Sequence, residues 1–366
     1  MTLRNYAAVA MAMAGLAAMS AAADPQDAPK STTWAPLDTA EIQKIERNAR
    51  EGDLAAIFDL ASLYEQGAVG DGKVNFDDAF KLYEKAAGRA DLRSRERLCL
   101  AYLTGEGRPA DIAKAMGYCN KLPDDDAVAL FSAGYDYDHG ISGPKDEKTA
   151  VAFYAQAVKK GSGDAMGAVG AKALAAGNPA GARKWFRQGV VNGSGDAMAH
   201  LAALLDSGQG GAADPDEARW LYANAGRRGN SVANAWLDSH GDDKALPHVN
   251  LTTANTSLIS EVTKNADGTT IDKPFNVWAL GKDLTKYFPA RAMADQVTGT
   301  VIVQCYIDGN HQLDVCLSKF EYPVGYDYGP IILALFNGQL KAADTDTQGA
   351  PTAHATATFV FRWLLN

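Results

Sequence analysis

Residues 54–67 read LAAIFDLASLYEQG, and residues 75–87 read NFDDAFKLYEKAA. The first stretch carries a small residue at Ala56, an apolar–small pair at Leu60-Ala61 and a glycine at Gly67. Glycine accepts the left-handed backbone conformation that ends a helix. Asn75 opens the second stretch, where its side chain can accept backbone N–H bonds that a helix start leaves unmade. The two stretches are therefore predicted to form a helical hairpin.

This hairpin pattern returns five times along the chain. Each second helix is predicted to start at an Asn or Asp that lies four residues before an Ala, and those alanines are 36, 35, 32 and 36 residues apart. The pairs are Asn75 with Ala79, Asp111 with Ala115, Asp146 with Ala150, Asn178 with Ala182 and Asp214 with Ala218. A period of this size is typical of stacked helix pairs, because one pair cannot bury its apolar face alone. We therefore expect an α-solenoid over residues 41–238.

The N-terminal segment resembles an export signal. Residues 1–23 hold Arg4, a weakly apolar stretch and Ala21-Ala22-Ala23 before Asp24, and residues 24–40 read as a disordered tail. Cleavage would move the net charge from −9 to −10, because 34 basic residues would remain against 44 acidic ones. An acidic chain without a basic cluster is a poor nucleic-acid binder. We expect a periplasmic protein of a Gram-negative bacterium, with no membrane span after signal cleavage.

Four cysteines in an exported chain favour two disulfides. Cys99 takes the small position of the second hairpin and Cys119 takes its aromatic position, so a bridge would replace the aromatic contact of the other hairpins. Cys305 and Cys316 fall on two neighbouring predicted strands, and a cross-strand bridge is expected there too. The apolar faces of those strands would separate the two sulfurs unless a bulge shifts the register.

A second domain is predicted after the repeats. Residues 239–284 read as a linker that could hold one short hairpin, and residues 285–366 as a small α+β domain. Its predicted elements are strands over 300–307 and 313–320 around the turn Asp308-Gly309-Asn310, a helix over 328–340 and a strand over 356–364. The fold class is therefore multi-domain, with an α-solenoid followed by a small α+β domain.

Two family resemblances follow from these patterns. The columns Ala56-Leu60-Ala61-Leu63-Tyr64-Gly67 and Ala79-Leu82-Tyr83-Ala86-Ala87 resemble Sel1-like repeats, which are relatives of the tetratricopeptide hairpin. That resemblance covers about half the chain and implies a scaffold that brings proteins together. Tyr287-Phe288-Pro289, Gly299-Thr300-Val301, Asp308-Gly309 and the strand with Phe359 and Phe361 resemble, in order and spacing, the TonB C-terminal domain.

The TonB resemblance implies a partner that pairs with a sheet edge through backbone hydrogen bonds. Carried onto this chain, the candidate edge is the run Thr356, Ala357, Thr358, Phe359, Val360 and Phe361; the alternative is an ordinary edge strand that pairs with no partner. A cleavable signal and a helical solenoid stand where TonB proteins keep a membrane anchor and a proline-rich spacer.

Sequence motifs for chemistry are scarce. The sequence has no GxSxG, HExxH or P-loop motif, so we expect no catalytic residues, no metal and no cofactor. A link of cysteine-rich Sel1-type relatives to β-lactam hydrolysis is the weakest hypothesis, and we expect no Ser-x-x-Lys nucleophile. The favoured function is a non-catalytic interaction scaffold that binds envelope proteins or peptides, with the solenoid docking one partner and the TonB-like domain another. The alternative is TonB-type energy transduction for outer-membrane transport.

Overall fold

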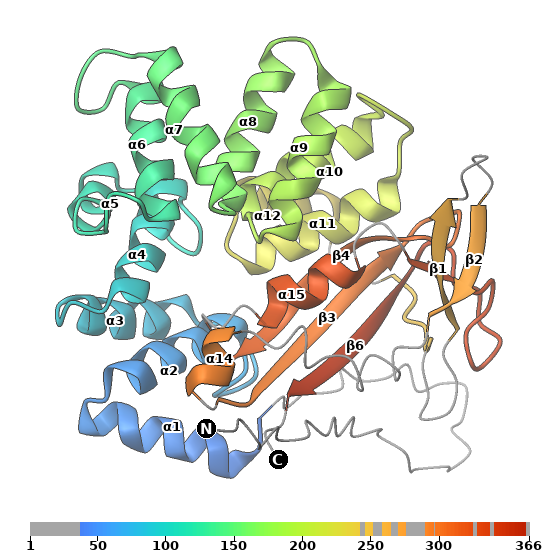
Figure 1. Cartoon of the computed structure of the whole chain (residues 1–366), viewed down its shortest axis with the longest axis horizontal. Coiled ribbons are helices and arrows are strands. Elements are labelled where there is room, and N and C mark those ends of the chain that lie inside the picture. The colour runs from blue at the N-terminus through green and yellow to red at the C-terminus, as the bar shows by residue number, and fades with distance from the viewer. Residues whose placement is uncertain are drawn as a thin grey trace, which may run out of the picture.

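The structure is a computed structural model that describes residues 37–241, 246–251, 258–264, 270–275, 290–295, 297–324, 328–336 and 340–363. The expected signal and most of the expected tail lie outside these residues. A curved array of helices arches over a sheet (Figure 1). The helices of the array are α1 (Thr39–Glu51), α2 (Leu54–Gln66), α3 (Phe76–Ala87), α4 (Leu92–Thr104), α5 (Ile112–Cys119), α6 (Ala127–His139), α7 (Glu147–Lys159), α8 (Gly163–Ala175), α9 (Pro179–Val191), α10 (Gly195–Ser207), α11 (Pro215–Arg227) and α12 (Ser231–His240).

The prediction of an α-solenoid is confirmed, including the predicted N-cap residues of the second helix in each hairpin. The five predicted capping residues each accept a hydrogen bond from a backbone N–H in the first turn of α3, α5, α7, α9 or α11. Asn75, for example, accepts from the N–H of Asp78 at 3.1 Å. At the other end of the hairpin's first helix, Gly67 has φ 67°, a conformation that side chains rarely adopt. Sequence-local signals thus set where these helices begin and end.

Small residues face aromatic rings inside the hairpins. A Cβ atom on Gly134 of α6 would lie 2.6 Å from the ring of Tyr154 on α7, and one on Gly170 of α8 would lie 2.7 Å from Phe186 on α9. Both aromatic side chains are buried. The missing Cβ therefore lets the paired helices approach closely. The fourth hairpin, whose spacing of 32 residues is the shortest, packs in the same way.

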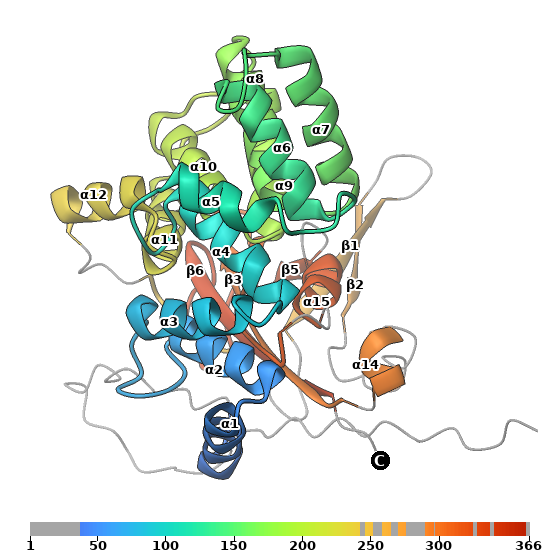
Figure 2. The same cartoon turned by 90° about the vertical axis from the view of Figure 1, so that its left-hand side faces the viewer.

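The curved array also touches itself. The N–H of Gly107, in the turn after α4, donates to the carbonyl of Gly229, in the turn after α11, at 3.4 Å. Both glycines have positive φ, and a Cβ on Gly229 would lie only 2.3 Å from the Gly107 nitrogen. Figure 2 shows the molecule from the side on which α3, α4 and α5 face the viewer. The second and fifth hairpins are thus joined at a contact that only glycine permits.

Two three-stranded sheets follow the helices. The larger has the order β4 (Leu313–Tyr322), β3 (Gly299–Ile307) and β6 (Ala355–Trp363), and the smaller the order β2 (Thr270–Pro274), β1 (Ile259–Lys264) and β5 (Leu340–Ala342). The short helices are α14 (Ala290–Asp295) and α15 (Tyr328–Phe336). The helix expected over 328–340 ends earlier, at Phe336. Asn337-Gly338 is a stop signal in the sequence, and Leu340 already belongs to β5, where it pairs with Glu261 of β1.

The segment 239–284 is more ordered than a linker in its described parts. It includes the end of α12, the antiparallel pair β1–β2 and core residues Val249, Leu251 and Ile259, each no more than 3% exposed. These apolar side chains belong to the core beneath α15. Burial of that surface removes it from water and holds the segment in place.

Both faces of the larger sheet are covered. On one face Val301, Val303 and Cys305 pack under α15 with Ile332 and Phe336. On the other face, Ile302 and Phe320 join the core of α1 and α2, whereas Tyr306, Val315 and Leu317 join the core of α9 to α12. The sheet therefore lies inside the arc of helices and contacts both its beginning and its end (Figure 1).

Candidate functional site at the sheet edge and the solenoid junction

The predicted pairing strand lies at an outer edge of the larger sheet. β6 pairs with β3 in an unbroken antiparallel register, and no other strand of the described residues pairs with its outer side. At its start the edge is covered, because Thr356 donates to the carbonyl of Pro247 at 2.8 Å and accepts from the N–H of Val249 at 2.9 Å. Alternate residues of a strand direct their backbone groups to the same side. Thr358 and Val360 therefore point outward as well, and their outward groups have no backbone partner among the described residues.

The side chains of this strand are less free than its backbone. Ala357, Phe359 and Phe361 are buried in the core under α15, and Thr356 is also buried. Thr358 and Val360 are partly buried. A partner at this edge would thus be bound mainly by main-chain hydrogen bonds.

The opposite edge of the sheet is covered by a side chain. Gln66, at the end of α2, accepts from the N–H of Glu321 on β4 at 3.0 Å and donates to the carbonyl of the same residue at 3.5 Å. The amide thus imitates the backbone of a neighbouring strand. The two edges differ in this respect, since Gln66 of the solenoid bonds to β4, whereas no described residue bonds to the outer backbone of β6 beyond Thr356.

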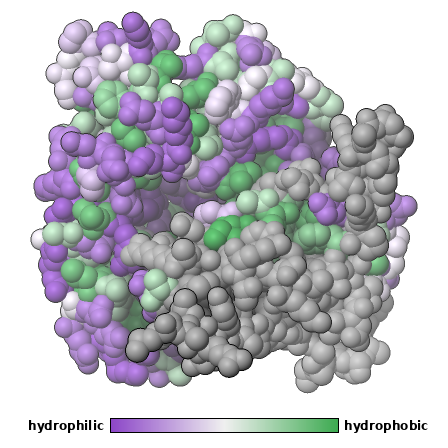
Figure 3. Space-filling view, viewed as in Figure 1, coloured by the Kyte–Doolittle hydropathy of each residue, from purple (hydrophilic) through white to green (hydrophobic). Residues whose placement is uncertain are grey.

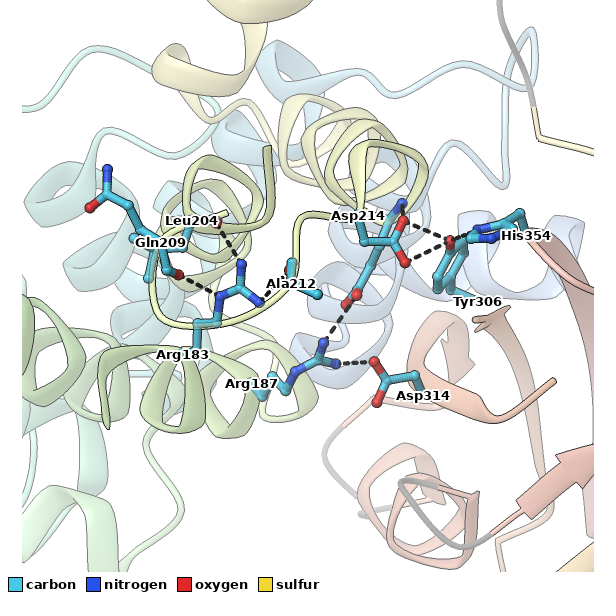
Figure 4. A network of polar contacts seen from close by, with 10 residues as sticks. Arg183, Arg187, Leu204, Gln209, Ala212, Asp214, Tyr306, Asp314 and His354 are labelled. Carbon is cyan, nitrogen blue, oxygen red and sulfur yellow. Dashed lines mark hydrogen bonds and ion pairs between the residues drawn. The ribbon is translucent and has the colours of Figure 1, made fainter. Parts of the chain in front are cut away.

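A buried ionic cluster joins the solenoid to the sheet. Arg187 of α9 lies 3.0 Å from Glu217 of α11 and 2.6 Å from Asp314 of β4 (Figure 4). Glu217 is only 1% exposed, and its Oε1 has no hydrogen-bond partner in the described part of the chain. Burial, opposed by the charge of Arg187, raises the pKa of Glu217 to about 7. One guanidinium thus holds together two helices and a strand.

A second polar contact shares the start of α11. The Tyr306 hydroxyl of β3 donates to Asp214 at 2.9 Å and lies 2.9 Å from Nδ1 of His354. The same Asp214 caps α11 by accepting from the N–H of Glu217 at 2.9 Å. Burial and the nearby Asp214 raise the pKa of Tyr306, so the hydroxyl stays protonated. Figure 4 shows the tyrosine directed from the sheet toward the helix start.

The loop before Asp214 is fixed by one arginine. Arg183 of α9 donates to the carbonyls of Leu204, Gln209 and Ala212 at 2.7, 2.7 and 2.9 Å (Figure 4). Three carbonyls that would otherwise need water are satisfied by a single side chain. The position of Asp214 is therefore set from both sides.

An ionic row lies along the inner side of the arc. Arg97 of α4 is paired with Glu65 of α2 and lies 3.6 Å from Glu106. Burial would raise the pKa of Glu65, but the charge and hydrogen bonds of Arg97 outweigh it, and the pKa is lowered. Tyr83 donates to Glu65 at 2.9 Å. These groups line a cavity of about 490 Å³ between the helices and β4.

Both cysteine pairs lie at bonding distance. The sulfurs of Cys99 and Cys119 are 2.07 Å apart and those of Cys305 and Cys316 are 1.94 Å apart. Cys305 lies opposite Cys316 in the register, and the ladder shifts between Tyr306 and Ile307. That irregularity places Leu313 and Cys316 in one core while Val315 faces the solenoid, which resolves the mismatch between the two strand faces.

Reactive arrangements are scarce in the described residues. One Ser-x-x-Lys sequence does occur, contrary to expectation, at Ser142-Gly143-Pro144-Lys145. It lies in an exposed turn after α6, where the N–H of Ser142 donates to Asp136, and a serine open to water lacks the enclosed setting of a nucleophile. Within the described ranges, no cluster of three His, Cys, Asp or Glu is placed to hold a metal. The described helices include none with the length and apolar character needed to cross a membrane.

The surface of the helical part is mostly hydrophilic, with hydrophobic residues scattered over it (Figure 3). Among larger apolar side chains, Val232 is 63% exposed, Val151 44% and Tyr137 40%. Scattered exposure of this kind is usual for a protein surface. Near the end of α6, Tyr135 stacks on His139, and Tyr137 stacks on Phe153 of α7.

The comparisons with known proteins concern the helical part. The Sel1 repeat family model matches residues 54–91, 93–122, 127–162 and 195–230. It leaves out α8 and α9, although these helices form the same hairpin as the others. No curated protein sequence matches the chain.

Several solved structures are similar to about half of the chain. A Sel1 repeat protein from Oxalobacter formigenes is 24% identical, with a TM-score of 0.34 and coverage of 55% of this chain and 93% of the other. A protective antigen of uropathogenic Escherichia coli with an SLR fold is 21% identical, with a TM-score of 0.29 and coverage of 56% and 53%. An immunity protein from Pseudomonas aeruginosa is 17% identical, with a TM-score of 0.33 and coverage of 52% and 75%.

Sel1-repeat proteins generally mediate protein–protein interactions and are typically not enzymes. The caps, the glycine stops and the family match agree on the same helices. Four hairpins of this chain match the Sel1 repeat family model.

Proposed function

We propose that this protein is a non-catalytic scaffold of the Gram-negative periplasm, in which the solenoid docks one envelope protein and the C-terminal domain pairs with an extended segment of another. The outward backbone groups of Thr358 and Val360 carry this proposal. An unpaired strand edge is a template for a further strand, and an added strand gains affinity from main-chain hydrogen bonds.

The position of the sheet limits which surface of the solenoid a partner protein can contact. The inner side of the arc is occupied by the protein's own strands β3 and β4. A partner of the repeats would therefore use the outer surface of the helices. The two binding surfaces then belong to one packed body, so a partner on one would be held at a fixed distance from a partner on the other.

The C-terminal domain is proposed to be TonB-like. The hairpin β3–β4, the helix α15 and the strand β6 follow each other in the order of that domain. Energy transduction is the alternative and needs an N-terminal anchor that is not removed. The intact mass of the protein purified from its envelope distinguishes the two: a chain that starts near Asp24 supports the scaffold, whereas an uncleaved chain supports energy transduction.

A single substitution tests strand pairing. Thr358→Pro removes one outward N–H while the ladder to β3 keeps its bonds, because proline is tolerated where the N–H of an edge strand faces away from the sheet. Thr358→Val is the matched control, since it keeps the N–H and a β-branched side chain. We expect in-cell crosslinks between this edge and a partner to be lost with proline and kept with valine.

The solenoid partner serves as an internal reference in the same cells. A crosslinking probe at Val232 on α12 reports contacts of the outer helical surface, and these should survive Thr358→Pro. Equal crosslinking at the edge in the proline and valine variants would overturn the strand-pairing proposal.

A further inference from the structure

A pocket of about 510 Å³ separates the last helices from the sheet. It is bounded by α11, α12 and residues of all three strands of the larger sheet, and it adjoins the cavity of the inner ionic row at Asn224, Arg227 and Lys319. Its charged lining residues are Arg219, Arg227 and Lys319, and among the described residues that line it there is no carboxylate. The chain as a whole has a net charge of −9, so the positive charge of this pocket is opposite in sign to that of the protein.

Lys319 is the innermost cation of this pocket. Its ammonium donates to Oδ1 of Asn224, a neutral acceptor. Asn224 is held in that orientation because its Nδ2 donates to the carbonyl of Trp220 at 2.7 Å. No carboxylate pairs with Lys319 in the described part of the chain. Burial, together with Arg227 and Arg228, lowers the pKa of Lys319 to about 7.

Other donors face the same space. The guanidinium of Arg227 makes no hydrogen bond or ion pair with any described residue, whereas that of Arg219 donates to the carbonyl of Gly241 at 3.1 Å. Gln304 of β3 accepts from the indole N–H of Trp220 at 3.4 Å, which leaves the amide NH₂ of Gln304 as a donor. Cations and an amide thus converge on one pocket with their charge uncompensated.

The remaining wall is apolar. Trp220, Ala223, Leu237 and Leu246 line the pocket beside the donors. Concave sites for small molecules usually combine apolar walls with a few polar groups that fix orientation. A largely buried ammonium without a paired anion is costly, so an anionic ligand at Lys319 would offset that desolvation penalty.

We propose that this pocket binds a small organic anion, in which a carboxylate or phosphate contacts Lys319 and Arg227 and an apolar body lies against Trp220 and Leu237. Such a site is separate from the β6 edge and from the outer face of the solenoid. The competing explanation is that Lys319 is only a structural contact between α11 and β4, with no ligand.

Three ring compounds that differ in one group test the proposal by titration calorimetry on the full chain. Benzoate carries a carboxylate, phenyl phosphate a phosphate and benzyl alcohol no charge. We expect one or both anions to bind and the alcohol to bind about tenfold more weakly or worse, since a hydrogen bond to a charged group contributes about that much. The stronger of the two anions identifies the ligand class.

Variants locate the site. Lys319→Met and Arg227→Gln should each lower the affinity for the anion by about tenfold or more. Lys184→Met removes the same charge from an exposed position of α9 and should leave that affinity unchanged. Denaturation curves show whether Lys319→Met still folds. If it does not, Arg227→Gln still tests anion binding, because an exposed guanidinium can be replaced without loss of the fold.

A pH series separates a ligand contact from a structural one. Benzoate should bind more weakly as the pH rises through about 7, because the Lys319 ammonium is lost there, and Lys319→Met should abolish this dependence. Failure of both anions to bind the wild-type chain, or equal binding by wild type, Lys319→Met and Arg227→Gln, would overturn the proposal.

Discussion

The contacts inside the helical hairpins and the contacts between the solenoid and the sheet are built from different chemistry. Inside a hairpin, a glycine or alanine meets a buried aromatic ring, as Gly170 meets Phe186. At the junction with the sheet, charges and hydroxyls add to the apolar packing, as the partly exposed Arg187 meets Asp314 and the buried Glu217. The first kind of contact depends on shape and is insensitive to pH, whereas the second depends on protonation. Stability within the repeats and attachment of the sheet can therefore be perturbed separately.

The largest effect is expected inside a hairpin. Phe186→Ala should lower the free energy of unfolding by about 3–5 kcal/mol, because it empties a fully buried site against a glycine that cannot fill the space. Urea denaturation measures the loss. Val232→Ala, at a side chain that is 63% exposed, is the control and should change stability by less than about 0.5 kcal/mol. Similar losses in both variants would contradict the assignment of the aromatic contact.

The second hairpin uses a covalent contact where the others use a ring. Replacing Cys99 and Cys119 together by alanine should cost about 3 kcal/mol, since the bridge closes a loop with a sequence separation of 20 residues. Denaturation with and without a reductant measures this. The reductant should destabilise the wild type more than the double variant, because the double variant retains only the Cys305–Cys316 bridge. No difference between oxidised wild type and the double variant would show that the first bridge does not form.

The junction should respond to pH through Glu217. Its pKa in the folded chain is about 7, above the value near 4.3 of an unfolded glutamate, so the folded state holds the proton more tightly. The resulting stabilisation is present at low pH and is lost as the pH rises from about 4 to about 7. Relative to Glu217→Gln, the wild type should therefore lose roughly 3 kcal/mol across that range.

Thermal denaturation at several pH values tests this difference. Glu147→Gln, at a side chain that is 79% exposed, is the matched control and should run parallel to the wild type. A Glu217→Gln variant that also runs parallel to the wild type would show that this carboxyl does not titrate in the folded protein.

The smallest effect is expected at a single hydroxyl of the junction. Tyr306→Phe removes the donor to Asp214 and should cost about 1–2 kcal/mol, because a partly buried carboxylate loses one hydrogen bond. Tyr137→Phe, at a side chain that is 40% exposed, serves as control. Hydrogen exchange should show the first turn of α11 still protected, since Asp214 keeps its cap to Glu217. Loss of that protection would mean that the tyrosine also positions the cap.

Local signals made the helical part predictable. Asp and Asn before each second helix, and glycine after most of the first helices, act within a few residues, so the sequence alone places the helix ends. The cysteine pair of the second hairpin followed from the same columns. Family matching alone would have missed the fourth hairpin, whereas the periodicity of Asn178 and Ala182 found it.

Non-local contacts limited the prediction for the sheet. The pairing of β1 with β5 joins residues about 80 positions apart, and no local pattern encodes it. The prediction from alternating apolar residues also missed that the sheet is covered by helices on both faces, although the sequence carries a signal for it. Residues 300–307 read TVIVQCYI, and a nearly continuous apolar run indicates a strand buried on both faces. The basic pocket could not be found from sequence, since Lys319 on β4 lies about 90 residues beyond Arg219 and Arg227 on α11.

The contact between Gly107 and Gly229 has a consequence for how such a chain can evolve. Open repeat arrays can gain or lose a unit, since each unit touches only its neighbours. Here the turns of the second and fifth hairpins meet, so a duplicated or deleted hairpin between them would pull that seam apart. The contact between Gly107 and Gly229 therefore fixes the number of repeats between the second and fifth hairpins.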